Sequence, residues 1–149
     1  MKKYEKLLLD KFKNFDISSK NNIIDSFKDL WQNYKTYDKH LEKRLKMGHI
    51  ENDIDYIYKT IKCMSHSKEC LVAKYDGNNI WDRIRYFDND EWIVIFAENG
   101  ILLTSHKKEE MEISFELKHK KFGAKIIQGE INEEFRNFFK CLQDEFRIF

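Results

Sequence analysis

The chain has 149 residues, a length that suits one domain with a single buried core. Apolar residues make up 42% and aromatic residues 15% of it, which excludes a disordered chain. The balance of 27 Lys and Arg against 26 Asp and Glu excludes a nucleic-acid surface built on bulk charge, so any basic surface must be local. Without a run of about 18 apolar residues or a signal peptide, we expect no membrane partner, a cytoplasmic location and reduced cysteines.

Four helices are expected in the first half of the chain, because apolar residues recur there at helical spacing. Cap-forming residues and a glycine mark several of their ends. The expected helices are 3–15, 23–34 behind Ser19 as N-cap, 36–47 stopped by Gly48, and 54–64 behind Asn52 as N-cap.

Four short strands follow, rich in β-branched and aromatic residues and separated by Asn, Asp and Gly. Asn99-Gly100 is the strongest signal for a tight hairpin. Because the connections are short, the strands are expected to form an antiparallel meander. The expected strands are 70–75, 80–87, 91–96 and 101–105.

The remainder is expected to be helical. Met111 to Phe122 fits a helix stopped by Gly123, although the alternation from Met111 to Leu117 also fits a strand. A closing helix is predicted over 130–146. The sequence therefore predicts an α+β fold with N-terminal helices, a four-stranded antiparallel β-meander and a C-terminal helix. We expect one domain, 1–149, comprising a helical extension (1–34), a core (36–106) and a helical tail (107–149).

The third expected helix carries His40 and Arg44, four residues apart and therefore on one face. The segment from Lys35 to His49 is locally basic, with five Lys or Arg residues against two acidic ones. Histidine is the commonest general acid or base, and arginine can grip a phosphate. A solvated basic face without chemistry is the alternative.

The second expected strand places Arg83 and Arg85 on one face, together with Trp81 and Phe87. Arginines beside aromatic rings can hold phosphates and stack bases. The alternative is an ordinary solvent face on which arginine stems cover the rings.

The fourth expected strand ends in Thr104-Ser105-His106, immediately before Lys107. Hydroxyls and a histidine at a strand end can orient a phosphate or donate a proton, but they are also common where a strand ends.

Cys63, His66 and Cys70 have the spacing of part of a zinc site. They supply three of the four ligands that a structural zinc requires, and free cysteines also pack as small hydrophobic residues. We expect no metal and no cofactor, and keep a zinc-stabilised domain as an alternative.

Four segments, taken in order, carry a family resemblance. They are His40-x3-Arg44-x3-Gly48-His49-Ile50, Asp53-x2-Tyr56-x3-Thr60, Arg83-Ile-Arg-Tyr-Phe and Trp92-Ile-Val-Ile-Phe-x3-Gly100-Ile-x2-Thr104. The set covers about residues 36–106. It resembles the barnase–EndoU–colicin–RelE-like (BECR) superfamily of small RNases, particularly its phage and polymorphic-toxin branch.

The resemblance implies His40 as general acid or base, accompanied by Arg44. It also implies Arg83 or Arg85 as the cation at the scissile phosphate, and Thr104 as the hydroxyl ending the last strand. The aromatic that the superfamily carries soon after this threonine is replaced by Ser105-His106, so His106 becomes a second acid/base candidate. The expected substrate-binding residues are Ser105, Lys107 and Trp81.

The implied function is a metal-independent endoribonuclease toxin that cleaves tRNA or mRNA through attack of the 2′-OH and leaves a cyclic phosphate. An antitoxin or immunity protein is the implied partner. The alternative is a non-catalytic binding module, such as an immunity or phage accessory protein, that uses the aromatic and arginine face of the sheet as an interface.

Overall fold

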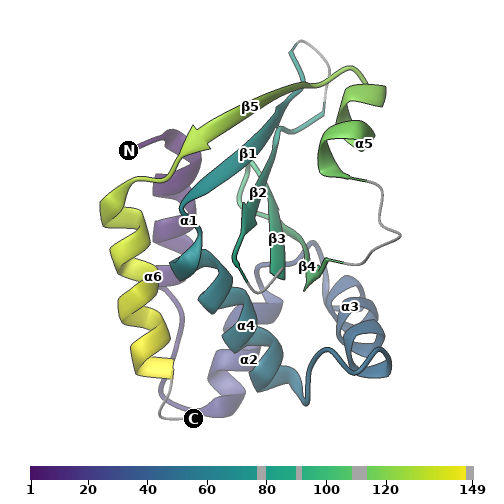
Figure 1. The fold of residues 1–149 in the computed structure, drawn as a ribbon. Coiled ribbons are helices and arrows are strands. Elements are labelled where there is room, and N and C mark those ends of the chain that lie inside the picture. Colours follow the sequence, from purple (N-terminus) through teal and green to yellow (C-terminus); the bar gives the residue numbers. More distant parts are fainter. Residues whose placement is uncertain (77–79, 90–91, 109–113, 147–149) are drawn as a thin grey trace.

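The structure is a computed structural model that describes residues 1–76, 80–89, 92–108 and 114–146. Figure 1 shows a sheet with helices on both sides. The helices are α1 (Lys3–Lys13), α2 (Lys20–Lys28), α3 (Tyr34–Lys46), α4 (Asp53–His66), α5 (Phe115–Lys121) and α6 (Glu133–Phe146). The strands are β1 (Glu69–Lys74), β2 (Arg83–Phe87), β3 (Trp92–Ala97), β4 (Leu102–Lys107) and β5 (Lys125–Glu130).

The sheet is antiparallel throughout its described strands, in the order β4-β3-β2-β1-β5. The α+β class and the meander of β1 to β4 are confirmed, as is the turn around Asn99-Gly100, where Gly100 has φ +86°. The expectation of four strands is wrong, because β5 returns to pair with β1 and makes a fifth. Residues 107–149 are therefore not a helical tail.

One face of the sheet carries the main hydrophobic core. Helices α1, α4 and α6 lie against this face in Figure 1, and α2 packs beside α4. Leu8, Phe12 and Phe27 from the first 34 residues are all buried in this core together with strand residues such as Tyr86 and Phe96. The N-terminal segment is thus an integral part of the core, because its amphipathic helices bury their apolar stripes there.

Side-chain caps fix the starts of two helices as predicted. The Ser19 hydroxyl accepts a hydrogen bond from the backbone N–H of Asn22, and the Asn52 side chain accepts one from that of Asp55. The second helix ends at Lys28 rather than continuing to Tyr34, and α6 begins at Glu133 rather than 130, where β5 still runs.

The opposite face of the sheet is covered in part by α5. Phe115 packs there with Ala73, Tyr75 and Ala124 in a second, smaller hydrophobic cluster. Helix α5 confirms the helical reading of this segment from Phe115 onward, and Gly123 follows it with φ +90°, whereas residues 109–113 lie outside the described residues.

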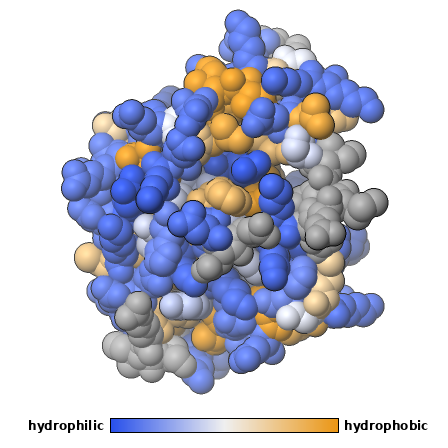
Figure 2. Space-filling view, in the orientation of Figure 1, coloured by the Kyte–Doolittle hydropathy of each residue, from blue (hydrophilic) through white to orange (hydrophobic). Residues whose placement is uncertain are grey.

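Hydrophilic side chains dominate the molecular face shown in Figure 2, with apolar patches scattered among them. In the part of the chain that the structure describes, no helix is both long and apolar enough to cross a membrane.

Candidate functional site

A cavity of about 390 Å³ lies on the α5 side of the sheet, between this helix, α3 and strands β2 to β4. It gathers five residues that the sequence singled out, although they are spread over 67 positions of the chain. They are His40, Arg83, Arg85, Thr104 and His106. We call this space the histidine cavity, because His119 of α5 also lines it.

The pleat of the sheet explains which strand residues face the cavity. Arg85 pairs with Ile95, and Ile95 pairs with Thr104, so the three side chains form one row across β2, β3 and β4. A register shift between Ile95 and Phe96 leaves Leu103 as an extra residue in β4, and Leu103 and Thr104 both line the cavity. Such a bulge changes the direction in which neighbouring side chains point.

Helix α3 supplies His40 from beside the edge of the sheet. The His40 ring packs on Trp31 with 4.7 Å between ring centroids, and Trp31 itself forms a parallel bridge to Leu102 of β4. Burial, followed by the charges of Arg44 and His106, lowers the pKa of His40 to about 4. The ring is therefore neutral at pH 7 and able to accept a proton.

His106 is held by its neighbour on the same face of β4. Its Nδ1 shares a hydrogen bond of 2.7 Å with the Thr104 hydroxyl. A hydrogen bond to one ring nitrogen fixes the orientation of the ring and of its other nitrogen. The charge of His106 is one of the causes that lower the pKa of His40, after burial and the charge of Arg44.

Helix α5 adds a third histidine, which the sequence reasoning missed. His119 shares a hydrogen bond with the hydroxyl of Tyr75, and the centroids of the His119 and Phe115 rings are 4.5 Å apart. Burial, followed by the charges of Lys118 and Arg83, lowers its pKa to about 4. In the sequence, His119 is marked only as a histidine within an expected helix, and no local motif connects it with the other residues of the cavity.

The cavity is strongly electropositive. Its lining includes Arg83, Arg85, Lys108 and Lys118 in addition to the histidines, and no carboxylate is among its described lining residues. The Arg85 guanidinium lies over two aromatic rings, 5.5 Å from the centroid of Phe87 and 5.8 Å from that of Phe115. This arrangement is suited to an anionic ligand, and above all to a phosphate.

Two residues expected at the site lie inside the protein instead. Arg44 is only 4% exposed and does not line the histidine cavity, because it lies seven residues after Tyr37 on the inner face of α3. Ser105 is 0% exposed on the core side of β4, where its hydroxyl bonds with Thr60 Oγ1 at 2.6 Å and Trp92 Nε1 at 2.9 Å. The structure therefore does not place Ser105 in the cavity with the other expected site residues.

Two further expected residues lie outside the cavity. Trp81 precedes β2 and is 55% exposed, and its carbonyl oxygen accepts a hydrogen bond from Arg83. Lys107 points away from His106 and lines a different cavity, together with Lys59 and Lys62. The structure therefore does not bring Trp81 and Lys107 together with the histidines in this cavity.

The expected zinc ligands do not converge. Cys63 is fully buried, with its Sγ 3.3 Å from the carbonyl oxygen of Trp92, whereas the Sγ of Cys70 faces the Tyr4 hydroxyl at 3.7 Å. Among the described residues, no group of three or more His, Cys, Asp or Glu side chains is arranged to hold a metal ion. The structure thus does not bring Cys63 and Cys70 together as ligands of one zinc ion.

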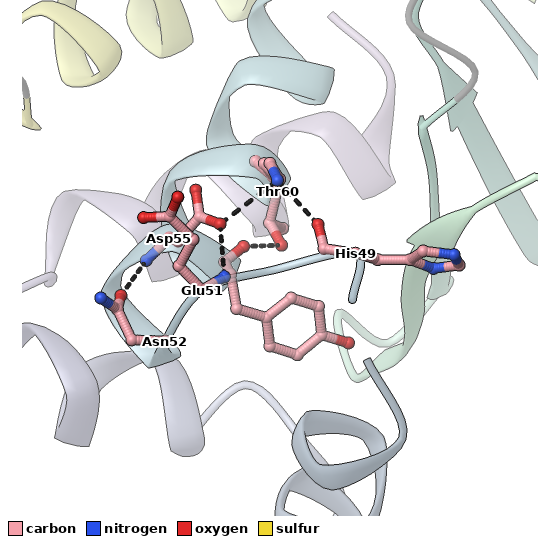
Figure 3. Close-up of polar contacts among 7 residues, drawn as sticks. His49, Glu51, Asn52, Asp55 and Thr60 are labelled. Carbon is pink, nitrogen blue, oxygen red and sulfur yellow. Dashed lines mark hydrogen bonds and ion pairs between the residues drawn. The ribbon is translucent and has the colours of Figure 1, made fainter. Parts of the chain in front are cut away.

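A polar network fixes the connection between α3 and α4 (Figure 3). Lys59 donates to the carbonyl oxygen of His49 at 2.7 Å and pairs with Asp55 at 3.2 Å. Asp55 in turn accepts from the backbone N–H of Glu51 at 2.9 Å. In Figure 3 the His49 ring points away from this network. The network ties the end of α3 to α4 and so helps to place the helix that carries His40.

Comparison with known proteins identifies a family to which the chain is similar. The family model described as "Uncharacterised protein aq_aa01" matches residues 3–147. The "Uncharacterized protein aq_aa01" of Aquifex aeolicus (strain VF5) is 28% identical over 107 residues, which are 71% of this chain and 80% of the Aquifex protein. No solved structure matches.

Proposed function

Because the chain belongs to the family described as "Uncharacterised protein aq_aa01", and that description names no activity, we propose its function from the chemistry of the histidine cavity. The proposed activity is metal-independent endoribonucleolytic cleavage of RNA. The observation that carries it is the convergence of His40, His106 and His119 with two arginines and two lysines around one cavity.

The first step needs a base for the 2′-OH of the substrate. His40 is neutral at pH 7, since its pKa is lowered to about 4, so it can take the proton from the 2′-oxygen. This low pKa of His40 is its value in the cavity without a ligand. A bound phosphate beside the ring favours the charged form and raises the pKa toward the working pH, where a general base is most effective.

The remaining steps need an acid and fixed cations. The 2′-oxygen forms a bond to phosphorus as the bond to the 5′-oxygen breaks, and protonated His106 gives its proton to that leaving oxygen. The products are a 2′,3′-cyclic phosphate and a 5′-hydroxyl end. Arg83 and Arg85 stabilise the additional negative charge on the phosphorane, because fixed cations need no reorganisation when that charge develops.

The resemblance to the BECR superfamily supports a narrower form of the proposal, a toxin that acts on tRNA or mRNA in the cytoplasm and is held in check by an antitoxin or immunity protein. The site residues that support this form are those of the resemblance that also line the cavity, namely His40, Arg83, Arg85 and Thr104, with His106 as the additional histidine.

The test is incubation of the purified protein with total RNA in EDTA, followed by analysis of the product ends. We expect cyclic phosphate and 5′-hydroxyl ends, and a loss of about 10²–10⁴-fold in rate for His40→Ala and for His106→Ala. His49→Ala is the matched control, because His49 lies outside the histidine cavity. An intact RNA pool with the wild-type protein, or equal rates for all variants, would refute the proposal.

One observation favours the alternative of a binding module. Ile80 and Trp81 are 43% and 55% exposed and lie next to each other in the segment just before β2. If RNA stays intact and a protein partner binds in a way that Trp81→Ala abolishes, the interface replaces the enzyme as the function.

A further inference from the structure

A second cavity adjoins the histidine cavity on the same face of the sheet. It has a volume of about 430 Å³ and shares one lining residue with the first, Arg85. Its other walls come from the end of α4, β1, β5, the end of β2 and the first turn of α5. The two cavities are therefore neighbours with Arg85 between them.

A single cross-strand row connects the two spaces. Gln128 pairs with Leu71 and Leu71 with Arg85, and the row then continues to Ile95 and Thr104. Adjacent strands are about 4.8 Å apart, so Gln128 and Thr104 each lie about 10 Å from Arg85 along the row, in opposite directions. A ligand whose anionic group meets Arg85 can extend from there into the second cavity.

The two cavities differ in chemistry. Whereas the described lining of the histidine cavity holds no carboxylate, the second cavity has two, Glu69 and Glu116, beside the amide of Gln128. Its lining also includes Lys68, His66 and Asn89, so it is mixed in charge. Gln128 Nε2 donates to Glu69 Oε2, which fixes this carboxylate and amide side by side. Phe87 adds an aromatic ring beside the guanidinium of Arg85.

The carboxylate and amide that lie side by side suit the edge of a nucleobase better than a second phosphate, which the two carboxylates would repel. Single-stranded RNA is read by stacking on aromatic rings or guanidinium planes and by hydrogen bonds to the base edges. A carboxylate accepts from an exocyclic amino group, which adenine, cytosine and guanine carry. Uracil carries none, and its single ring N–H lies between two carbonyl oxygens that a carboxylate repels.

We propose that the second cavity is a base subsite that holds the nucleoside whose 3′-phosphate occupies the histidine cavity, and that it selects amino-bearing bases over uracil. The inference rests on the proposed ribonuclease function. Glu69 and Gln128 read the base edge, and Arg85 lies where the phosphate and base portions of the nucleotide meet.

The test measures binding of the four nucleoside 3′-monophosphates and of inorganic phosphate by titration calorimetry at pH 6. We expect at least one amino-bearing nucleotide to bind about tenfold more tightly than uridine 3′-monophosphate and than inorganic phosphate. Glu69→Gln should reduce that preference to less than about threefold. Glu134→Gln, an exposed glutamate on α6, is the matched control and should leave the preference intact.

A second measurement separates this inference from the function on which it rests. Cleavage is followed in oligodeoxynucleotides that contain a single adenosine, cytidine, guanosine or uridine ribonucleotide. Cleavage at all four with equal rates, together with equal binding of the four monophosphates, overturns the base subsite and leaves the ribonuclease standing. Selective binding without any cleavage overturns the ribonuclease and retains a nucleotide site, and the absence of nucleotide binding overturns the subsite.

Discussion

Replacement of Ser105 by alanine separates a structural from a substrate-binding role for the residue between Thr104 and His106. Ser105 Oγ lies 2.9 Å from Trp92 Nε1, which donates to it, and 2.6 Å from Thr60 Oγ1. Because Thr60 gives its own proton to the carbonyl oxygen of Tyr56 at 2.9 Å, Ser105 is the donor in the bond to Thr60. The substitution thus removes one donor and one acceptor from a buried network.

The expected cost follows from what is left without a partner. The indole N–H of Trp92 loses the acceptor that the structure gives it, and an unsatisfied buried donor costs about 1–3 kcal/mol. The lost hydrogen bond to Thr60 adds about 1 kcal/mol, so Ser105→Ala should lower the free energy of unfolding by about 2–4 kcal/mol in total. In a chain of this size the corresponding fall in Tm is about 6–12 °C.

Urea unfolding monitored by circular dichroism provides the assay. For Ser105→Ala we expect a lower midpoint with an unchanged m-value. In the double variant with Trp92→Phe, the loss of unfolding free energy should be smaller than the sum of the two single losses, because the donor and the acceptor are removed together. Thr104→Val, on the cavity side of the same strand, should cost less than about 1 kcal/mol. A loss below about 0.5 kcal/mol for Ser105→Ala would refute the network argument.

Three further predictions concern stability. In the folded protein the pKa values of His40 and His119 are lowered to about 4, so below pH 6.5 these rings become protonated in the unfolded chain first. The free energy of unfolding should therefore fall by about 1–2 kcal/mol per ring between pH 6.5 and 4. Urea midpoints across this range check it, and a midpoint that rises on acidification would contradict it. Asn52→Ala should cost about 1 kcal/mol through loss of the cap of α4, with Asn52→Ser recovering most of it in the same assay. Gly100→Ala should lower the free energy of unfolding by about 1–2 kcal/mol, because Gly100 has φ +86°. The loss should be slightly larger still, because the side chain of Lys11 lies 2.9 Å from the new Cβ. Gly48→Ala, at φ +72° with open space around it, isolates the backbone contribution, and equal thermal stability of both variants and the parent would rule out the strain.

The sequence predicted the elements whose patterns are local. Helix periodicity, the caps at Ser19 and Asn52 and the turn at Asn99-Gly100 all concern residues within a few positions of one another. Strand β5 escaped detection, because Ile126 and Ile127 are consecutive rather than alternating and the strand is defined by pairing with β1, more than 50 residues earlier. A largely exposed edge strand carries little pattern of its own.

The same distinction applies to the candidate site. Arg83 and Arg85 were placed on one face by the two-residue period of a strand, and they do share the cavity. That period also predicts that Ser105 faces away from Thr104 and His106, and the structure has its side chain on the core side of β4. The position of His119, in contrast, depends on how α5 folds back over the sheet, which no short spacing in the sequence encodes.

The bridge between Trp31 and Leu102 has a consequence for association between molecules. A sheet with two outer strands can recruit strands from other chains through unpaired backbone groups. On β4, the backbone N–H of Leu102 donates to the carbonyl oxygen of Leu30 at 2.8 Å, so the segment between α2 and α3 occupies the start of that outer edge. On β5, Lys2 donates to the carbonyl oxygen of Glu130 at 2.8 Å. Residues from the first 31 positions thus occupy one end of each outer strand, and we expect their removal to expose backbone groups there to pairing with other chains.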